Sequence, residues 1–165
     1  MPSTYTPIAT QTLGSAAASV TFSSISGSYT DLIIISQTGS GAPANGVYIR
    51  FNGDTSSIYS TTDLWGDGSS AASGRTSNQS LMRILGRGTG ASNDLNNNSI
   101  AQIMNYSNTT TYKTMLVRAN SPAYGVGATV GLWRSTSAVT AFTITAEGGN
   151  LPSGSTFTLY GVKSA

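Results

Sequence analysis

The sequence predicts an all-β protein, an antiparallel β-sandwich of jelly-roll-like form with about nine short strands. Apolar residues occur in short runs, many of which alternate with polar residues as in strands that bury one face. Clusters of glycine, asparagine, aspartate, serine and proline, which favour turns, separate these runs. No segment repeats apolar residues at a helical period, and the alanine-rich segment 15–19 is too short for an independent helix. A plain immunoglobulin-like sandwich is the alternative, although its Cys–Trp–Cys pattern is absent.

Three strands are predicted in the first third of the chain. Residues 18–25 alternate valine and phenylalanine with small polar residues. Residues 31–36, DLIIIS, form a continuous apolar run, which is typical of a strand that is buried on both faces. Residues 47–51, VYIRF, place three apolar side chains on one face and Tyr48 with Arg50 on the other. Further strands are predicted at residues 81–85, 99–106, 111–119, 127–135, 138–147 and 155–163.

The N-terminal segment and the segment 54–80 are less regular. Residues 1–17 are polar with one weak strand pattern, so they form either the first strand or an N-terminal arm that docks on a neighbour. Residues 18–165 are expected to form a single β-sandwich domain. Because residues 54–80 exceed the usual length of a simple loop, we expect some structure there. The prediction is a short strand at Ile58 and Tyr59, with an ordered surface excursion over the rest.

The composition indicates a protein that packs against other subunits. The chain has 165 residues, which fits one domain. Only 8% of the residues are charged, against about 25% in an ordinary globular domain, while 38% are hydrophobic. Disordered chains combine low hydrophobicity with high net charge, so we expect a folded domain. Serine and threonine are abundant, and a surface of neutral hydroxyl groups lacks the charge that usually keeps proteins apart.

The charge pattern and the apolar runs argue against nucleic-acid binding and membrane insertion. The net charge is +2, but the arginines and lysines are dispersed, whereas nucleic-acid-binding proteins cluster them. The N-terminus lacks the basic and apolar regions of a signal peptide. The longest apolar run, LIII, is far too short to span a membrane. We therefore expect a soluble protein that is synthesised in a cytoplasm.

The residue types also exclude the commonest catalytic sites. Histidine and cysteine are absent, which excludes the usual Ser–His–Asp and Cys–His nucleophiles, histidine and thiolate metal sites, and disulfides. A pair of carboxylates could still serve a glycoside hydrolase, and the candidates are Asp54, Asp63, Asp67, Asp94 and Glu147. Asp54 and Asp67 lie in the turn sequences NGD and GDG, where aspartate orients the backbone. We therefore favour a structural role for them and expect no catalytic residue and no enzyme activity.

Three glycine-containing segments are predicted to be turns or loops and not binding sites. The Asn45–Gly46 pair predicts a hairpin turn. DLWGDG, residues 63–68, lacks the alternating oxygen ligands and the later glutamate of a calcium loop. GRGTGASN, residues 86–93, lacks the Lys-Ser/Thr pair and the following helix of a phosphate-binding loop. We expect no metal and no cofactor.

Aromatic side chains are the strongest candidates for contacts with a partner or a glycan, although we expect most of them in the core. Tyrosine and tryptophan combine a large apolar surface with a polar group, which suits interfaces. Trp133 lies beside Arg134 at a strand end, where it suits either environment. The candidate interface or ligand contacts are Tyr59, Trp65, Asp67, Arg75, Trp133 and Arg134.

The order of several sequence blocks resembles a family of small tailed-bacteriophage virion proteins. The blocks are VTFSSI, YTDLIIIS, VYIRFNGDTSSIYS and LWGDGSS, followed by NYSNTTTYKTMLVRA, VGLWRST and the closing GSTFTLYGVK, and the resemblance covers nearly the whole chain, roughly residues 8–165. The resemblance implies a β-sandwich structural protein of the virion. Members of this type are head decoration (cement) proteins, head fibres or knobs, or distal tail-fibre modules. No catalytic motif and no functional residue carries over from the resemblance.

The resemblance and the composition together favour a capsid decoration protein on the surface of the phage particle. We expect a homotrimer that docks on the phage major capsid protein or another virion protein and stabilises the head shell. The alternative is a tail-fibre or head-fibre module that binds host surface glycan, which the aromatic and hydroxyl-rich residues motivate. A polysaccharide hydrolase is the third hypothesis, and the absence of histidine disfavours it.

Overall fold

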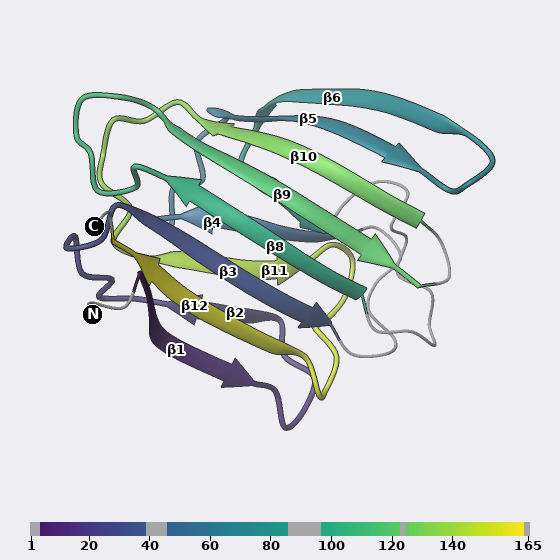
Figure 1. Ribbon diagram of the computed structural model, residues 1–165, viewed down its shortest axis with the longest axis horizontal. Helices are drawn as coiled ribbons and strands as arrows, with labels where there is room; N and C mark the ends of the chain where they lie inside the picture. The colour runs from purple at the N-terminus through teal and green to yellow at the C-terminus, as the bar shows by residue number, and fades with distance from the viewer. Residues whose placement is uncertain (1–3, 39–45, 86–96, 123–124, 164–165) are drawn as a thin grey trace.

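The computed structural model describes residues 4–38, 46–85, 97–122 and 125–163. All regular secondary structure in these ranges is β-strand, and twelve strands form two antiparallel sheets (Figure 1). The two sheets lie face to face, the larger one in front in Figure 1, and a shared core lies between them. The predicted antiparallel β-sandwich is therefore confirmed, and the jelly-roll-like form stays a prediction.

The larger sheet contains eight strands and the smaller sheet contains four. In spatial order the larger sheet is β1 (Tyr5–Thr12), β12 (Thr156–Val162), β3 (Asp31–Thr38), β8 (Asn97–Met104), β9 (Lys113–Ser121), β10 (Gly125–Trp133), β5 (Tyr59–Gly66) and β6 (Ala71–Gln79). The smaller sheet is β2 (Ser19–Phe22), β11 (Phe142–Ala146), β4 (Val47–Phe51) and β7 (Met82–Leu85). Neighbours in space are mostly distant in sequence, so the chain crosses between the sheets repeatedly.

Apolar side chains from the inner faces of both sheets form the core. Leu32 and Ile34 of β3 are fully buried, as are Ile49 and Phe51 of β4 in the other sheet. All four side chains belong to the shared core. The alternation predicted for residues 47–51 is confirmed, since every second side chain of β4 is buried. Burying a side chain of this size contributes about 1.5–3 kcal/mol, so these inner faces hold the two sheets together.

The larger sheet extends beyond the smaller one at its β5–β6 end. β7, an edge strand of the smaller sheet, contacts β8, β9, β10 and β5 across the core. β6 lies one strand further out and forms the edge of the larger sheet, as Figure 1 shows. The inner side of this β5–β6 overhang consequently meets the edge of the smaller sheet and not its middle.

The prediction of a surface excursion at residues 54–80 is wrong. This segment contains the hairpin of β5 and β6, in which Thr62 pairs with Arg75 and Trp65 pairs with Ala72. β6 reads AASGRTSNQ and has neighbours on one side only, with most of its side chains exposed. Because an exposed edge strand needs no apolar alternation, its sequence carries little strand signal. Asn45 and the segment 86–93 lie outside the described residues.

The N-terminal segment contains a strand. Of the two interpretations of residues 1–17, the structure shows the first, because β1 pairs with β12 from Tyr5 to Thr12. A β-bulge interrupts the pairing between Pro7 and Ala9, where proline cannot donate a hydrogen bond. Ala17 forms an isolated bridge with Leu151 beyond the strand.

The prediction that residues 31–36 are buried on both faces is also wrong. Leu32 and Ile34 point inward and are fully buried, but Ile35 points outward and exposes 41% of its surface. The smaller sheet covers only one face of the larger sheet, so the outward isoleucines of this central strand remain open to solvent. The sequence of β3 is apolar on both faces, but the described part of the chain covers only one of them.

Candidate functional site

Two of the six side chains predicted as candidate contacts are core residues. Tyr59 is fully buried and Trp133 exposes only 2% of its surface, and their rings stack with centroids 6.1 Å apart. The Tyr59 hydroxyl accepts a hydrogen bond from the Phe51 N–H and donates to the Phe51 carbonyl, both at 3.2 Å. The Trp133 indole N–H donates to Asp54 Oδ2 at 2.8 Å. Neither ring is available to a ligand or a partner subunit, which corrects their assignment as contacts.

The other four predicted residues lie on or beside the β5–β6 hairpin without forming one site. Trp65 is partly exposed near the end of β5, and Asp67 lies in the turn that follows. Arg75 is exposed on β6. Arg134 follows β10 and donates to the carbonyl of Ser57 at 3.2 Å and to Oδ1 of Asn78 at 3.0 Å.

The aspartates of the segments NGD and GDG orient turns, as the sequence predicts. Asn52 and Gly53 have positive φ angles of 50° and 68°, the geometry of a tight turn that asparagine and glycine tolerate. Asp54 then accepts hydrogen bonds from the Ser56 hydroxyl and N–H, and the Ser56 hydroxyl is the main cause of its lowered pKa. Asp67 accepts from the backbone N–H groups of Ser70 and Ser69, which lower its pKa.

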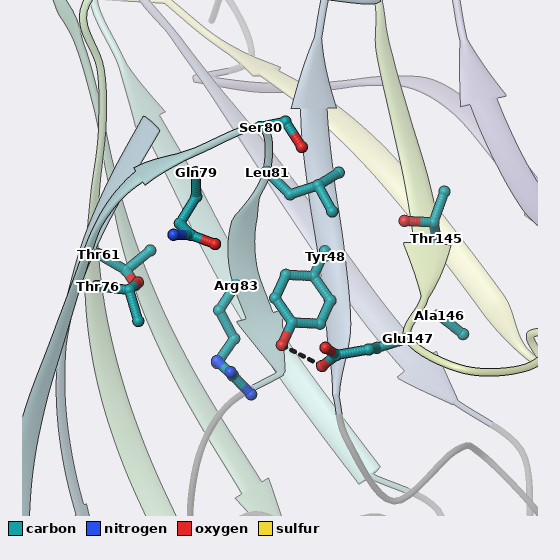
Figure 2. Close-up of a pocket in the computed structure, with 10 residues that line it drawn as sticks. All are labelled: Tyr48, Thr61, Thr76, Gln79, Ser80, Leu81, Arg83, Thr145, Ala146 and Glu147. Atoms are coloured by element: carbon teal, nitrogen blue, oxygen red, sulfur yellow. Dashed lines mark hydrogen bonds between the residues drawn. The ribbon is translucent and has the colours of Figure 1, made fainter. Parts of the chain in front are cut away.

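A polar pocket lies where the β5–β6 overhang meets the smaller sheet (Figure 2). Its volume is about 320 Å³, at the lower end of the range for small-molecule sites. The lining residues are Tyr48, Thr61, Thr76, Gln79, Ser80, Leu81, Arg83, Thr145, Ala146 and Glu147. Figure 2 shows Tyr48 between Arg83 and Glu147, with the threonines of β5 and β6 on the opposite side.

Strand pairing places the three central side chains of this pocket. Tyr48 of β4 pairs with Arg83 of β7 on one side and with Thr145 of β11 on the other. The Tyr48 hydroxyl donates to Glu147 Oε2 at 2.5 Å, and the Arg83 guanidinium carbon lies 4.8 Å from the centre of the Tyr48 ring. The sequence named Glu147 only as one of several candidate carboxylates and placed Tyr48 on the outward face of the VYIRF strand, and nothing in it brought the two together with Arg83.

Burial and hydrogen bonding hold Tyr48 in its protonated form. Desolvation is the largest cause, followed by the hydrogen bond to Glu147, and together they raise the pKa of Tyr48 to about 12. The positive charge of Arg83 opposes this shift, and the negative charges of Glu147 and Asp63 add to it. The Tyr48 hydroxyl therefore acts as a hydrogen-bond donor near neutral pH and not as a base.

We expect the protein to lose stability between about pH 10 and pH 12. Burial raises the pKa of Tyr59 from 10.0 to about 12, as it does for Tyr48. A raised pKa means that the folded state holds the proton more tightly, so this stability is complete below pH 10 and is lost as the pH rises to 12. Urea unfolding at several alkaline pH values should show this decline, and Tyr48→Phe should make it shallower. An identical slope in Tyr48→Phe and the wild type would contradict the assignment.

The outer face of the larger sheet carries a contiguous group of exposed apolar side chains. We call this group the outer patch: Ile35 (41% exposed), Leu64 (60%), Ile100 (37%), Leu116 (41%), Val126 (63%) and Val130 (50%). Ile35 pairs with Ile100, and Leu116 pairs with Val130, so these side chains lie side by side across adjacent strands. Figure 1 is viewed onto this face. Two surface depressions, of about 370 and 410 Å³, lie on either side of Val126.

A single positive charge lies within the outer patch. Arg118 is exposed on β9, between Ile100 on β8 and Ala128 on β10. On the outer face of β8, β9, β10 and β5, which the structure describes in full, Arg118 is the only charged side chain. The patch therefore suits a partner surface that is apolar and contributes one acceptor for a guanidinium group.

The described residues contain no group of three or more acidic side chains that could hold a metal ion. Within the same ranges, no helix is present that could span a membrane. These observations do not contradict the predictions that the protein binds no metal and does not insert into a membrane, and both stay predictions.

Comparison with known proteins places the chain in no family. No protein-family model matches the sequence, and no curated protein matches it. Among solved structures, the marine PL-14 alginate lyase from Aplysia kurodai is similar with a TM-score of 0.34 and 13% identity, over 86% of this chain and 72% of that chain. A mutant of alginate lyase Aly36B in complex with an alginate tetrasaccharide has a TM-score of 0.31 and 7% identity, over 94% of this chain and 79% of that chain. Similarity at this level does not extend to activity.

Proposed function

We propose that this chain is a non-catalytic structural subunit of a bacteriophage virion, a decoration protein that docks on the head shell through the outer patch. The outer patch is the observation that carries the proposal. The largest apolar patch on a typical monomer covers about 300–600 Å² and is often functional. Here six large aliphatic side chains lie on one sheet face, and each exposes more than a third of its surface.

The charge within the outer patch supports a shell subunit as the partner. A second copy stacked face to face about an axis near Arg118 would bring the two Arg118 side chains together, and such like-charge contacts are unfavourable. A shell subunit that presents an apolar strip with one carboxylate would cover the aliphatic side chains and pair with Arg118. In a homotrimer, which stays a prediction, the three copies would contact each other through other surfaces and leave this face for the shell.

The use of the carboxylates supports a non-catalytic role. Every carboxylate in the described ranges accepts a hydrogen bond from the protein itself. Asp31 accepts from Gln102 and from the Asn105 N–H, both at 2.8 Å, and Asp63 accepts from Thr129 at 2.6 Å. Side chains that are committed to turns and strand contacts are poor candidates for a pair that must exchange protons with a substrate.

Removal of this protein from the particle tests the proposal. Phage heads made without it should lose resistance to heat and osmotic shock, because a ligand that binds the assembled shell stabilises it by mass action. Adding the purified chain back should restore that resistance. Heads that keep full resistance without the protein, or that fail to bind the added chain, would overturn the proposal.

A fibre or tail-tip module that binds host surface glycan is the second candidate function. The polar pocket of Tyr48, Arg83 and Glu147 is the specific observation that favours it. The two functions use different surfaces, since the pocket and the outer patch share no residue.

A further inference from the structure

The pocket beneath the β5–β6 overhang has the position and size of a ligand site. It forms where strands from both sheets converge, with Thr61 and Thr76 on one wall and Tyr48 on the other. The segment that connects β6 to β7, with Ser80 and Leu81, adds to the lining. A volume of about 320 Å³ suits a small polar unit.

The lining is rich in hydrogen-bonding groups and has no net charge. Arg83 contributes a guanidinium group and Glu147 a carboxylate, and Gln79 contributes an amide that both donates and accepts. Besides the Tyr48 phenol, four aliphatic hydroxyl side chains belong to the same lining, those of Thr61, Thr76, Ser80 and Thr145. Only Leu81 and Ala146 are aliphatic. This lining departs from the mostly apolar walls of typical small-molecule sites, so a strongly polar ligand is expected.

The polar groups are held in place before any ligand arrives. The Tyr48 hydroxyl donates a hydrogen bond to Glu147, and the Arg83 guanidinium group lies over the Tyr48 ring. These contacts hold the three side chains in a row, with Tyr48 in the middle. The Glu147 N–H also donates to the Gly46 carbonyl at 3.1 Å, which fixes the backbone at the rim. Two Thr hydroxyls on the opposite wall, those of Thr61 and Thr76, lie 2.7 Å apart. Fixed polar groups lose little freedom on binding, which favours recognition.

We propose that this pocket binds a neutral sugar unit of a glycan. Each sugar hydroxyl both donates and accepts, so a pair of them matches a carboxylate acceptor beside a guanidinium donor. Because the charges of Glu147 and Arg83 are opposite, the lining favours neither an anionic nor a cationic ligand, and a neutral polyhydroxylated ligand can bond to both groups. The proposal rests on the second candidate function, the glycan-binding module, and names its ligand class. It does not depend on whether the protein docks on the head shell through the outer patch.

The test is a titration of the purified chain with oligosaccharides of neutral hexoses, followed by backbone amide NMR. We expect shifts confined to the strands of the pocket, with the largest changes near Tyr48 and Arg83. Arg83→Met should weaken the affinity by about tenfold or more, because a hydrogen bond to a charged group is worth about 1.5–3 kcal/mol. Arg75→Met is the matched control: Arg75 lies on β6, one of the strands that line the pocket, but on the outer face opposite Thr62, and its loss should leave the affinity unchanged.

Further variants keep the test decisive if Arg83→Met fails to fold. Gln79 lines the pocket, is exposed, and donates its side-chain hydrogen bond to the Ser77 carbonyl and not to Tyr48. Gln79→Ala should therefore leave the fold intact and also weaken binding. A titration with uronic-acid oligosaccharides tests the charge class, and tighter binding of these than of neutral hexoses would overturn the assignment. No binding of neutral hexoses at millimolar concentration, or unchanged affinity in folded Arg83→Met and Gln79→Ala, would overturn the site itself. None of these outcomes bears on docking of the head shell.

Discussion

Replacing Leu116 by glutamate is expected to abolish docking on the head shell while the fold stays intact. Leu116 lies in the middle of the outer patch, beside Val130, and already exposes 41% of its surface. The folding free energy should therefore change by less than about 1 kcal/mol, as for most surface substitutions. Docking would bury the new carboxylate against an apolar strip, and on the same face of β9 as Arg118 it would also compete with the shell carboxylate for the guanidinium group. The affinity for heads that lack this protein should fall at least about a hundredfold, which co-sedimentation of the purified variant would measure.

Tyr112→Glu provides the control for this experiment. Tyr112 is as exposed as the patch residues, at 55%, but it lies in the connection between β8 and β9, outside the outer patch. The same substitution there should leave docking unchanged. If Leu116→Glu docks as tightly as the wild type and keeps the wild-type circular dichroism spectrum, the outer patch is not the docking surface.

Replacing Trp133 by alanine is expected to destabilise the protein by about 3–5 kcal/mol. The Trp133 ring stacks on Tyr59 and meets the edge of Phe51 with ring centroids 5.6 Å apart, so its removal opens a cavity between the sheets. The indole also holds Asp54 in the turn after β4. Because small domains are stable by about 5–15 kcal/mol, this variant should unfold at a much lower urea concentration than the wild type.

Trp133→Phe separates the contribution of the ring from that of the hydrogen bond. Phenylalanine keeps an aromatic ring beside Tyr59 but leaves Asp54 without the indole donor, so a smaller loss of about 1–3 kcal/mol is expected. The measurement is urea unfolding of both variants under the same conditions. If the free energy of unfolding of Trp133→Ala lies within about 1 kcal/mol of the wild-type value, the placement of this residue in the core is contradicted.

Most strands with a clear alternation of apolar and polar residues could be predicted from the sequence. Residues 47–51 match β4 in full, and the predictions at 99–106, 127–135 and 155–163 each overlap a strand within about two residues of its ends. β6 could not be predicted, because an edge strand with one neighbour and exposed side chains needs no apolar face. The turn role of Asp54 was predictable, since its hydrogen bonds with Ser56 are made within two residues along the chain, whereas its bond with the Trp133 indole was not.

The candidate sites were far less predictable, because they depend on contacts between distant parts of the chain. Tyr48, Arg83 and Glu147 come from β4, β7 and the end of β11, which only strand pairing brings together. The sequence singled out Tyr59 and Trp133 as large amphipathic rings, and nothing local shows that both point inward. The outer patch was hidden for a related reason, since the run at residues 31–36 suggested burial on both faces.

The amino-acid sequence alone determined the β class, the positions of most turns, and the absence of histidine and cysteine chemistry. Those properties follow from residue type and from interactions between near neighbours in the chain. Only the tertiary structure decided which face of each strand meets the other sheet, and therefore which apolar side chains form the core and which form the outer patch. The physical reason is that a period of two residues tells which side chains share a face, whereas what covers that face depends on strands that are distant in sequence.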